Sequence, residues 1–454
     1  MTKAKYEIDM CSGPLPGKIL LFALPLMATG VLQLLFNAAD VIVVGHYAGG
    51  DALAAVGSNG AIINLIVNVF IGLSIGASAV VAKYYGAQEE QEVSETTHTA
   101  MLLSFFSGIF VMVLGYFLAT PILRWMDTPP EVLSLASLYL KIYFLGMPGC
   151  MVYNFGAAVL RGIGDTRRPL IYLFLSGIVN VILNLILVIQ FQMSVAGVAI
   201  ATVVSQYLSA GLVLWCMFRT NGCYQLIRHE FKIHKDKLMM ILKIGIPAGV
   251  QGAIFSISNI LIQSSVNSFG SIAMAGNAAA VSIEGFVYTC MNSVAQAALT
   301  FTSQNVGAHK WARLRGITLI CLGIVIVVGQ GLGLLAFYFG QPLLAIYAPG
   351  QPDIIAMGMV RLSFVAATYA LDGIMDLLAG IVRGMGSSLA PMFVTLIGAC
   401  GLRIVWIYTI FQWHHDLGTL YLSYPISWIV TSLAHLVCYF VVKNRLLKKA
   451  AVTV

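Results

Sequence analysis

Long apolar segments separated by short polar breaks make up most of this chain. A helix needs about 20 apolar residues to cross a lipid bilayer, and stretches of that length recur from Lys18 to Val442. The pattern therefore predicts an all-α membrane protein with twelve transmembrane helices. The predicted spans are 18–45, 52–82, 96–122, 131–160, 168–191, 194–217, 238–267, 272–303, 315–347, 353–383, 390–413 and 417–442.

The amino-acid composition excludes a soluble fold. Hydrophobic residues make up 59% of the chain and charged residues only 9%, whereas about a quarter of the residues in soluble domains are charged. Lipid must therefore surround most of the protein. Eight cysteines are scattered singly, so we expect neither disulfides nor a bound metal or other cofactor. The polar residues before Lys18 contain no short apolar core, and we expect no cleaved signal peptide.

The net charge of +7 follows the loops of a membrane protein. Most lysines and arginines lie at the termini, at helix ends or in the loops after even-numbered spans, and the exceptions are Arg124, Lys141, Arg361 and Arg403. Because basic residues accumulate on the cytoplasmic side of membrane proteins, we place both termini in the cytoplasm. This distribution argues against a nucleic-acid partner.

The chain repeats itself at an offset of 222 residues. The segment 160–169 recurs as 382–391 with an arginine, two glycines and a proline at the same positions, and Pro25 recurs as Pro247. Duplicated halves place the substrate path of a transporter at the interface between them, where rocking of the halves gives alternating access. The repeat therefore predicts a two-lobed membrane transporter.

The longest hydrophilic stretch between predicted helices, 219–237, follows the sixth span. We therefore expect an N-terminal six-helix lobe at 1–218, a cytoplasmic inter-lobe linker at 219–237 and a C-terminal six-helix lobe at 238–454. Both halves enter the membrane in the same orientation, so the two lobes form a parallel repeat.

Each lobe contains the same predicted turn, Arg-Gly-x-Gly-x4-Pro, at a cytoplasmic helix end. Two glycines permit a tight turn, and proline can begin the next helix. A structural role is the leading interpretation, and a cytoplasmic hinge is the alternative. The residues are Arg161, Gly162, Gly164 and Pro169 in the first copy and Arg383, Gly384, Gly386 and Pro391 in the second.

Four acidic residues lie inside predicted spans: Asp40, Glu284, Asp372 and Asp376. An aspartate at the centre of a membrane helix costs about 2.5–3.5 kcal/mol on the insertion scale. Each of the four therefore needs a partner or a proton. Ionisable residues inside membranes are mostly functional, so all four are candidate functional residues.

A polar stripe on the first helix ends at Asp40. Gln33, Asn37 and Asp40 are spaced by four and three residues, so they share one helix face, which we expect to line a cavity. Desolvation disfavours the charged form of a carboxyl group, so a buried carboxyl can exchange a proton near neutral pH. Asp40 is placed to do so; a structural hydrogen bond is the alternative role.

Two acids of the tenth span lie on one helix face. Asp372 and Asp376 are four residues apart and repel each other if both ionise, so we expect one of them to hold a proton. Arg403, on the eleventh span, is the expected buried counter-charge for an acid of this lobe.

The remaining acid, Glu284, shares a helix face with Asn277, Tyr288 and Met291. A carboxylate beside an aromatic ring and a polarizable thioether suits lipophilic cations. A carboxyl group satisfied by hydrogen bonds between helices is an equally weighted alternative.

Several short segments resemble the multidrug and toxic compound extrusion (MATE) family. They include Phe36–Asp40, Gly197–Thr202, Ser303–Ala308 and Ser423–Trp428, and with the Arg-Gly turns the resemblance covers nearly the whole chain. It implies two six-helix bundles that export small organic compounds, often cationic, in exchange for protons or sodium ions. It also implies a monomeric, multi-pass protein of the bacterial plasma (inner) membrane, in contact with membrane lipid.

The resemblance further implies a coupling-ion site in the N-terminal lobe. In relatives of the archaeal and DNA-damage-inducible types, residues that match Asp40, Asn180 and Thr202 form a cation or proton site. Asn184 stands where those relatives carry a second carboxylate, which lowers the charge of the site and weakens the case for strong sodium binding. We predict an H+ or Na+ site formed by Asp40, Asn37, Asn180, Asn184 and Thr202.

A second site is implied in the C-terminal lobe. Asp372 occupies the position of an acid in the sodium-linked, NorM-like branch of the family, but Phe255 replaces that branch's glutamate on the seventh helix. The chain therefore matches neither branch fully. The candidates for a substrate-binding surface or second ion site are Asp372, Asp376, Glu284, Gln33, Tyr288, Met291 and Arg403.

Two rival functions are weaker. A lipid-linked oligosaccharide flippase of the same superfamily would share this architecture, but its anionic substrate needs a basic cavity, and the predicted interior offers little positive charge beyond Arg403. The segment Gly162–Asp165 matches the G-x-G-D sequence of intramembrane proteases, but Asp165 lies among arginines at a cytoplasmic turn. The chain contains no phosphate-binding loop or other catalytic motif, so we expect a transporter rather than an enzyme.

Overall fold

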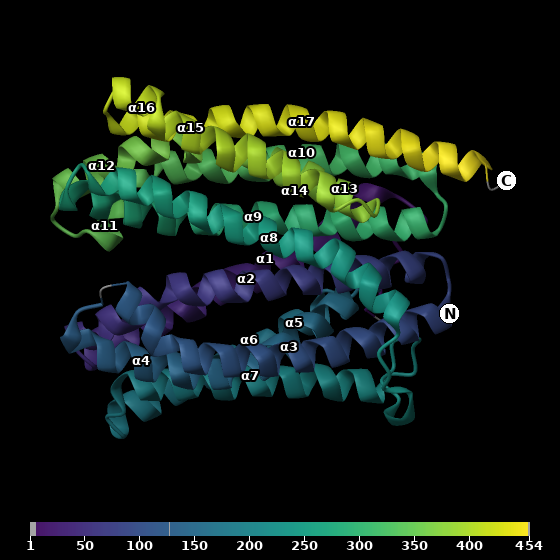
Figure 1. Cartoon of the computed structure of the whole chain (residues 1–454), viewed down its shortest axis with the longest axis horizontal. Coiled ribbons are helices and arrows are strands. Elements are labelled where there is room, and N and C mark those ends of the chain that lie inside the picture. The colour runs from purple at the N-terminus through teal and green to yellow at the C-terminus, as the bar shows by residue number, and fades with distance from the viewer. Residues whose placement is uncertain (1–5, 127, 453–454) are drawn as a thin grey trace. The chain divides into compact units, whose positions relative to one another are not determined.

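The computed structural model describes residues 6–126 and 128–452. Helices fill most of this part of the chain, which contains no β-strand (Figure 1). A backbone surrounded by lipid must satisfy its own hydrogen bonds, and a helix does so within one segment. The predicted all-α membrane fold is confirmed.

The first six predicted spans correspond to the elements before residue 220. The fourth span is bent by 48° where α4 meets α5, because Gly146 and Pro148 interrupt the helix there. The elements are α1 (Leu15–Tyr47), α2 (Gly50–Gly86), α3 (Glu90–Trp125), α4 (Pro130–Leu145), α5 (Met147–Gly162), α6 (Arg167–Leu185), the π-helix η1 (Ile186–Gln190) and α7 (Ser194–Arg219).

The last six predicted spans correspond to the elements after residue 234. The tenth span is bent by 46° before α13. After the short 3-10 helix η2 (Arg228–Glu230), the elements are α8 (Lys235–Asn267), α9 (Ser271–Gly307), α10 (Trp311–Tyr338), α11 (Gly340–Tyr347), α12 (Pro352–Phe364), η3 (Ala366–Thr368), α13 (Ala370–Gly384), α14 (Leu389–Thr395), the π-helix η4 (Leu396–Gly401), α15 (Leu402–Tyr408), α16 (Ile410–Trp413) and α17 (Leu417–Val452).

Within residues 6–126 and 128–452, nine helices are long and apolar enough to cross a membrane. The number is eleven if each of the two bent helix pairs counts as one span. The helix α9 is 37 residues long but less apolar, because serine, threonine, asparagine and glutamine occur along it. It corresponds to the predicted span 272–303. With α9, a helix or a run of consecutive helices stands at each of the twelve predicted spans.

The chain forms two compact units, and α1 and α8 each contribute to both. The first unit contains Ala28–Gly249 and the segment that ends at Asp9, and the second contains Met10–Met27 and the residues from Val250 onward. Ala28 and Val250, where α1 and α8 change unit, are 222 residues apart, which is the offset of the sequence repeat. The segment predicted as a linker, 219–237, belongs to the first unit; the division into lobes at 1–218 and 238–454 stays a prediction.

The two Arg-Gly turns have the same backbone hydrogen bonds. The N–H of Gly164 donates to the carbonyl of Arg161 (3.0 Å), and the N–H of Gly386 donates to that of Arg383 (2.8 Å). Both glycines have positive φ, 102° and 89°, which favours glycine over residues with a Cβ. Pro169 and Pro391 lie in the first turns of the helices that follow.

Within the first unit, α2 and α8 touch backbone to backbone through glycines. A Cβ at Gly72 would stand 2.2 Å from the nitrogen of Gly249, and a Cβ at Gly76 would stand 2.4 Å from the carbonyl oxygen of Ile241. Small residues permit such close approach of membrane helices. The contact fastens the first half of α8 to the first unit.

We expect Gly72→Ala to destabilise the protein by about 1–3 kcal/mol, the usual cost of overpacking, because the backbones of α2 and α8 must move apart. The measurement is thermal unfolding in detergent. The matched control is Gly60→Ala on the same helix, where a Cβ would meet no atom within 4 Å. Equal melting temperatures for the two variants would contradict the close contact.

Candidate functional site

Asp40 is the buried end of the polar stripe on α1. Its side chain is 8% exposed, whereas Gln33 and Asn37 are exposed. The three residues share a helix face, but neighbouring helices cover only its last member. The stripe therefore places one ionisable group inside the first unit.

Four polar side chains from three helices form a hydrogen-bonded ring, and the Asp40 carboxylate is one of its members. The Asn184 amide donates to Oδ1 of Asp40 and to Oδ1 of Asn180 (3.3 Å). The Asn180 amide donates to the Thr202 hydroxyl (3.4 Å), and that hydroxyl lies 3.4 Å from Oδ2 of Asp40. The structure thus brings together Asp40 of α1, Asn180 and Asn184 of α6, and Thr202 of α7. Asn37, predicted with them, is exposed instead.

The ring leaves hydrogen-bonding capacity unused. The Thr202 hydroxyl has one hydrogen, and the carbonyl of Val198 (3.0 Å) competes with Asp40 for it. The amide oxygen of Asn184 is buried and accepts no hydrogen bond from the described residues. Both Asp40 and Asn184 therefore keep oxygen lone pairs that can receive a proton or a cation.

The π-helices stand beside buried polar residues in both units. Asn184 lies two residues before η1, and Arg403 lies two residues after η4. A π-turn widens the helix and often marks a functional site. This local irregularity is a second reason to place function near Asn184.

In the second unit, Glu284 is paired with an arginine that the sequence analysis did not assign to it. Arg361 of α12 holds the carboxylate with Nε (3.0 Å) and Nη2 (2.7 Å), and the side chains of Arg361 and Glu284 are 6% and 3% exposed. The Nη1 of Arg361 donates to Oδ1 of Asn277 (2.9 Å), which also accepts from the Tyr421 hydroxyl (3.0 Å). Glu284 is therefore neutralised by a two-pronged ion pair.

Arg403 is surrounded by a hydroxyl group, two aromatic rings and the nearby acid Asp372. Its Nε donates to the hydroxyl of Ser427 (2.9 Å), and its guanidinium lies 4.2 Å from the ring centre of Tyr424 and 5.7 Å from that of Trp428. Asp372 is close enough to interact electrostatically. Arg403 is thus a buried cation stacked on aromatic rings, while Arg361 is the counter-charge of Glu284.

Asp372 and Asp376 lie on one face of α13, as their spacing predicts. Asp372 is 8% exposed, and the two carboxyl groups interact with each other. Tyr288 of α9 and Arg383 both lie near the Asp376 carboxyl group. Met291, predicted on the same surface, is 1% exposed and packs against glycines of α10 and α13, so it fills the interior of the unit.

Arg361 is the functional candidate that sequence reasoning missed. It was one of four basic residues away from the predicted cytoplasmic ends, which was a usable signal. Its partner could not be assigned because Glu284 lies 77 residues earlier. Only the packing of α12 against α9 brings the two charges together.

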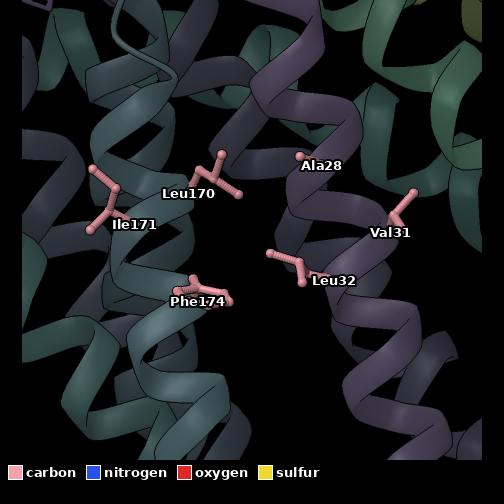
Figure 2. Close-up of a pocket in the computed structure, with 6 residues that line it drawn as sticks. All are labelled: Ala28, Val31, Leu32, Leu170, Ile171 and Phe174. Carbon is pink, nitrogen blue, oxygen red and sulfur yellow. The ribbon is translucent and has the colours of Figure 1, made fainter.

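An apolar groove lies in the first unit, on α1 two turns before Asp40. It has a volume of about 460 Å³ and is lined by apolar side chains of α1 and α6 (Figure 2). Such a groove suits an alkyl or aryl group and offers no ligand for an ion. The lining residues are Ala28, Val31, Leu32, Leu170, Ile171 and Phe174.

Asp165 serves the local backbone. Its carboxylate accepts the N–H groups of Arg167 (3.0 Å) and Arg168 (3.1 Å) at the start of α6 and forms an ion pair with the Arg168 guanidinium. It therefore caps a helix. This role removes the basis for the protease hypothesis, which needs two facing acids within the membrane.

Comparison with known proteins matches both halves of the chain to one family. A model described as MatE matches residues 25–186 and 247–409. The chain is 27% identical over 393 residues to the probable multidrug resistance protein YoeA of Bacillus subtilis (strain 168), covering 85% of this chain and 84% of the relative. It is 26% identical over 398 residues to the probable multidrug resistance protein NorM of Thermotoga maritima, covering 85% and 84%.

The fold also matches a solved structure. An outward-facing multidrug resistance MATE family transporter of the MOP superfamily superposes with a TM-score of 0.91, covering 98% of this chain and 100% of that chain. Their sequences are 20% identical, so this likeness supports the architecture alone.

Proposed function

Because this chain belongs to the multidrug and toxic compound extrusion (MATE) family, we propose that it exports small organic compounds from the bacterial cytoplasm by alternating access. Export is coupled to the entry of protons or sodium ions. The observation that carries the proposal is the ring of Asp40, Asn180, Asn184 and Thr202. A single ionisable group held by neutral donors inside a membrane can gain and lose one charge without dismantling its surroundings.

A proton can bind to the ring without any rearrangement of its side chains. Protonation of Asp40 needs only the unused lone pairs of its carboxylate, and the Asn184 amide remains a donor to it. A sodium ion needs several oxygen ligands, and Asn184 turns its nitrogen toward Asp40. A half-turn of that amide would bring its unpaired oxygen toward the Asp40 carboxyl group, where it could accept the O–H of a protonated Asp40 or contact a cation.

We propose that the substrates are cationic and that Asp372 and Asp376 attract them. Glu284 contributes no net charge because Arg361 pairs with it. Among the described residues, Asp372 and Asp376 of α13 form no such two-pronged ion pair, and the exposed ring of Tyr288 lies beside them. The groove between α1 and α6 suits the apolar part of a lipophilic compound.

We further propose that the protein is a monomer in the bacterial plasma membrane with both termini in the cytoplasm. The positions of the lysines and arginines support this orientation. A lipid-linked oligosaccharide flippase remains the second candidate. Its anionic substrate would need a basic cavity, but Glu284 neutralises Arg361 and Arg403 is buried against aromatic rings.

The test is efflux of a fluorescent organic cation such as ethidium from membrane vesicles that contain the full chain. A proton gradient and a sodium gradient are imposed separately, and empty vesicles give the background. We expect efflux with one of the two gradients, and that gradient identifies the coupling ion. Background efflux under both gradients would reject drug antiport and make the flippase the leading function.

A further inference from the structure

A buried histidine at the beginning of α3 holds the segment that joins the two repeats. His98 is 1% exposed. Its Nε2 accepts the backbone N–H of Ile227 (3.0 Å), and its Nδ1 lies 2.8 Å from the carbonyl oxygen of Ser94. A backbone N–H can only donate, so Nε2 carries no hydrogen and Nδ1 donates to Ser94. This arrangement requires the neutral form of His98.

Further contacts fasten the same segment to the first unit. The N–H of His234 donates to the Thr99 hydroxyl (3.1 Å), and the ring of Phe231 stands edge-on to His98 at 5.2 Å between centres. The ammonium of Lys237, at the start of α8, forms an ion pair with Glu92. We call the contacts of 227–237 with the first three turns of α3 the linker clasp.

We propose that the linker clasp closes only while His98 is neutral and opens when the cytoplasm becomes acidic. Protonation places a hydrogen on Nε2, which then faces the N–H of Ile227, so the acceptor is lost and two donors oppose each other. The change also puts a charge on a buried ring. A single proton thereby removes the central hydrogen bond between α3 and the linker.

Other titratable groups at the clasp respond differently. His234 lies 3.4 Å from the Glu95 carboxylate, so protonation of His234 strengthens that contact and opposes opening. The ammonium of Lys237 is held among carboxylates and over a tyrosine ring, and none of these groups contacts Nε2 of His98. The charged and titratable side chains around the clasp are Tyr84, Glu92, Glu95, Glu230, His234, Asp236 and Lys237.

The clasp gives the transporter a sensor of the proton that it imports. This consequence rests on the proposed proton coupling, whereas the clasp itself does not. Opening would release the segment before α8, and α8 is one of the two helices that contribute to both units. Acidification of the cytoplasm would thus act on the connection between the repeats.

The experiment is hydrogen exchange of the full chain in lipid nanodiscs, read by mass spectrometry on peptides covering 224–234. It is run at about pH 7.5 and about pH 5.5, on either side of the ordinary pKa of a histidine side chain, about 6.5, with labelling times scaled for intrinsic exchange. In the wild type we expect the protection factors of these amides to fall at least about fivefold at the lower pH. A change of this size corresponds to the net free energy of one hydrogen bond.

Three variants separate His98 from the other groups. His98→Gln keeps a neutral acceptor and is expected to lose no protection at the lower pH, and His98→Ala is expected to lose protection at both pH values. His229→Gln changes an exposed histidine of η2 and is expected to behave as the wild type does. The proposal is overturned if wild type and His98→Gln respond alike, or if wild-type protection is equal at both pH values. Transport is not measured, so failure here leaves the proposed export function untouched.

Discussion

Replacing Asp40 with asparagine is expected to reduce gradient-driven efflux to the background rate of empty vesicles. The amide has the shape of the carboxylate but can neither bind a proton nor hold a cation by charge. Asn184 can still donate to the new carbonyl oxygen, and the Thr202 hydroxyl can accept from the new amide nitrogen, so the ring and the fold should persist. The measurement is the initial rate of efflux, with the melting temperature recorded in parallel.

The matched control for this variant is Asp51→Asn, which removes an exposed acid in the first turn of α2. We expect it to retain the wild-type rate. Asp372→Asn serves as the comparison in the second unit. Efflux that survives in Asp40→Asn and disappears in Asp372→Asn would contradict the assignment and move ion coupling to the acids of α13.

The sequence predicted the helices well because lipid imposes a simple rule on them. Every span must be long, apolar and internally hydrogen-bonded, and this requirement is readable one segment at a time. Even α9, which is less apolar than the other spans, coincides with the predicted span 272–303. The bends at α4 and at α13 were not predicted, because proline and glycine allow a bend but neighbouring helices set its direction.

The residues of the candidate site were likewise predicted in part. The resemblance to a family supplied Asp40, Asn180, Asn184 and Thr202 as members of one site, and the structure brings these four side chains together. Helix periodicity also grouped Asn37 with Asp40, but it does not say how far a neighbouring helix covers that face, and Asn37 is exposed. Helix periodicity therefore predicts which residues share a helix face, and the packing of neighbouring helices determines which of those residues come into contact.

Charge pairing was the least predictable feature. Arg403 was the expected counter-charge for an acid of this lobe, and its neighbours are Ser427, two aromatic rings and Asp372. The pairing of Arg361 with Glu284 was not predicted. Which buried arginine meets which acid depends on the contacts between helices, which the sequence of a single chain does not contain.

Removing one member of the Glu284–Arg361 pair is expected to cause the largest loss of stability. Breaking a buried ion pair costs about 3–5 kcal/mol because it leaves a charge without a partner. In Arg361→Met the carboxylate of Glu284 would lose both of its guanidinium contacts, and the melting temperature in detergent should fall accordingly. The double variant Glu284→Leu with Arg361→Met removes both charges and should recover most of the loss, since apolar replacement of a whole pair is often neutral. If the double variant is no more stable than Arg361→Met alone, the cost arises from lost packing rather than from an unpaired charge.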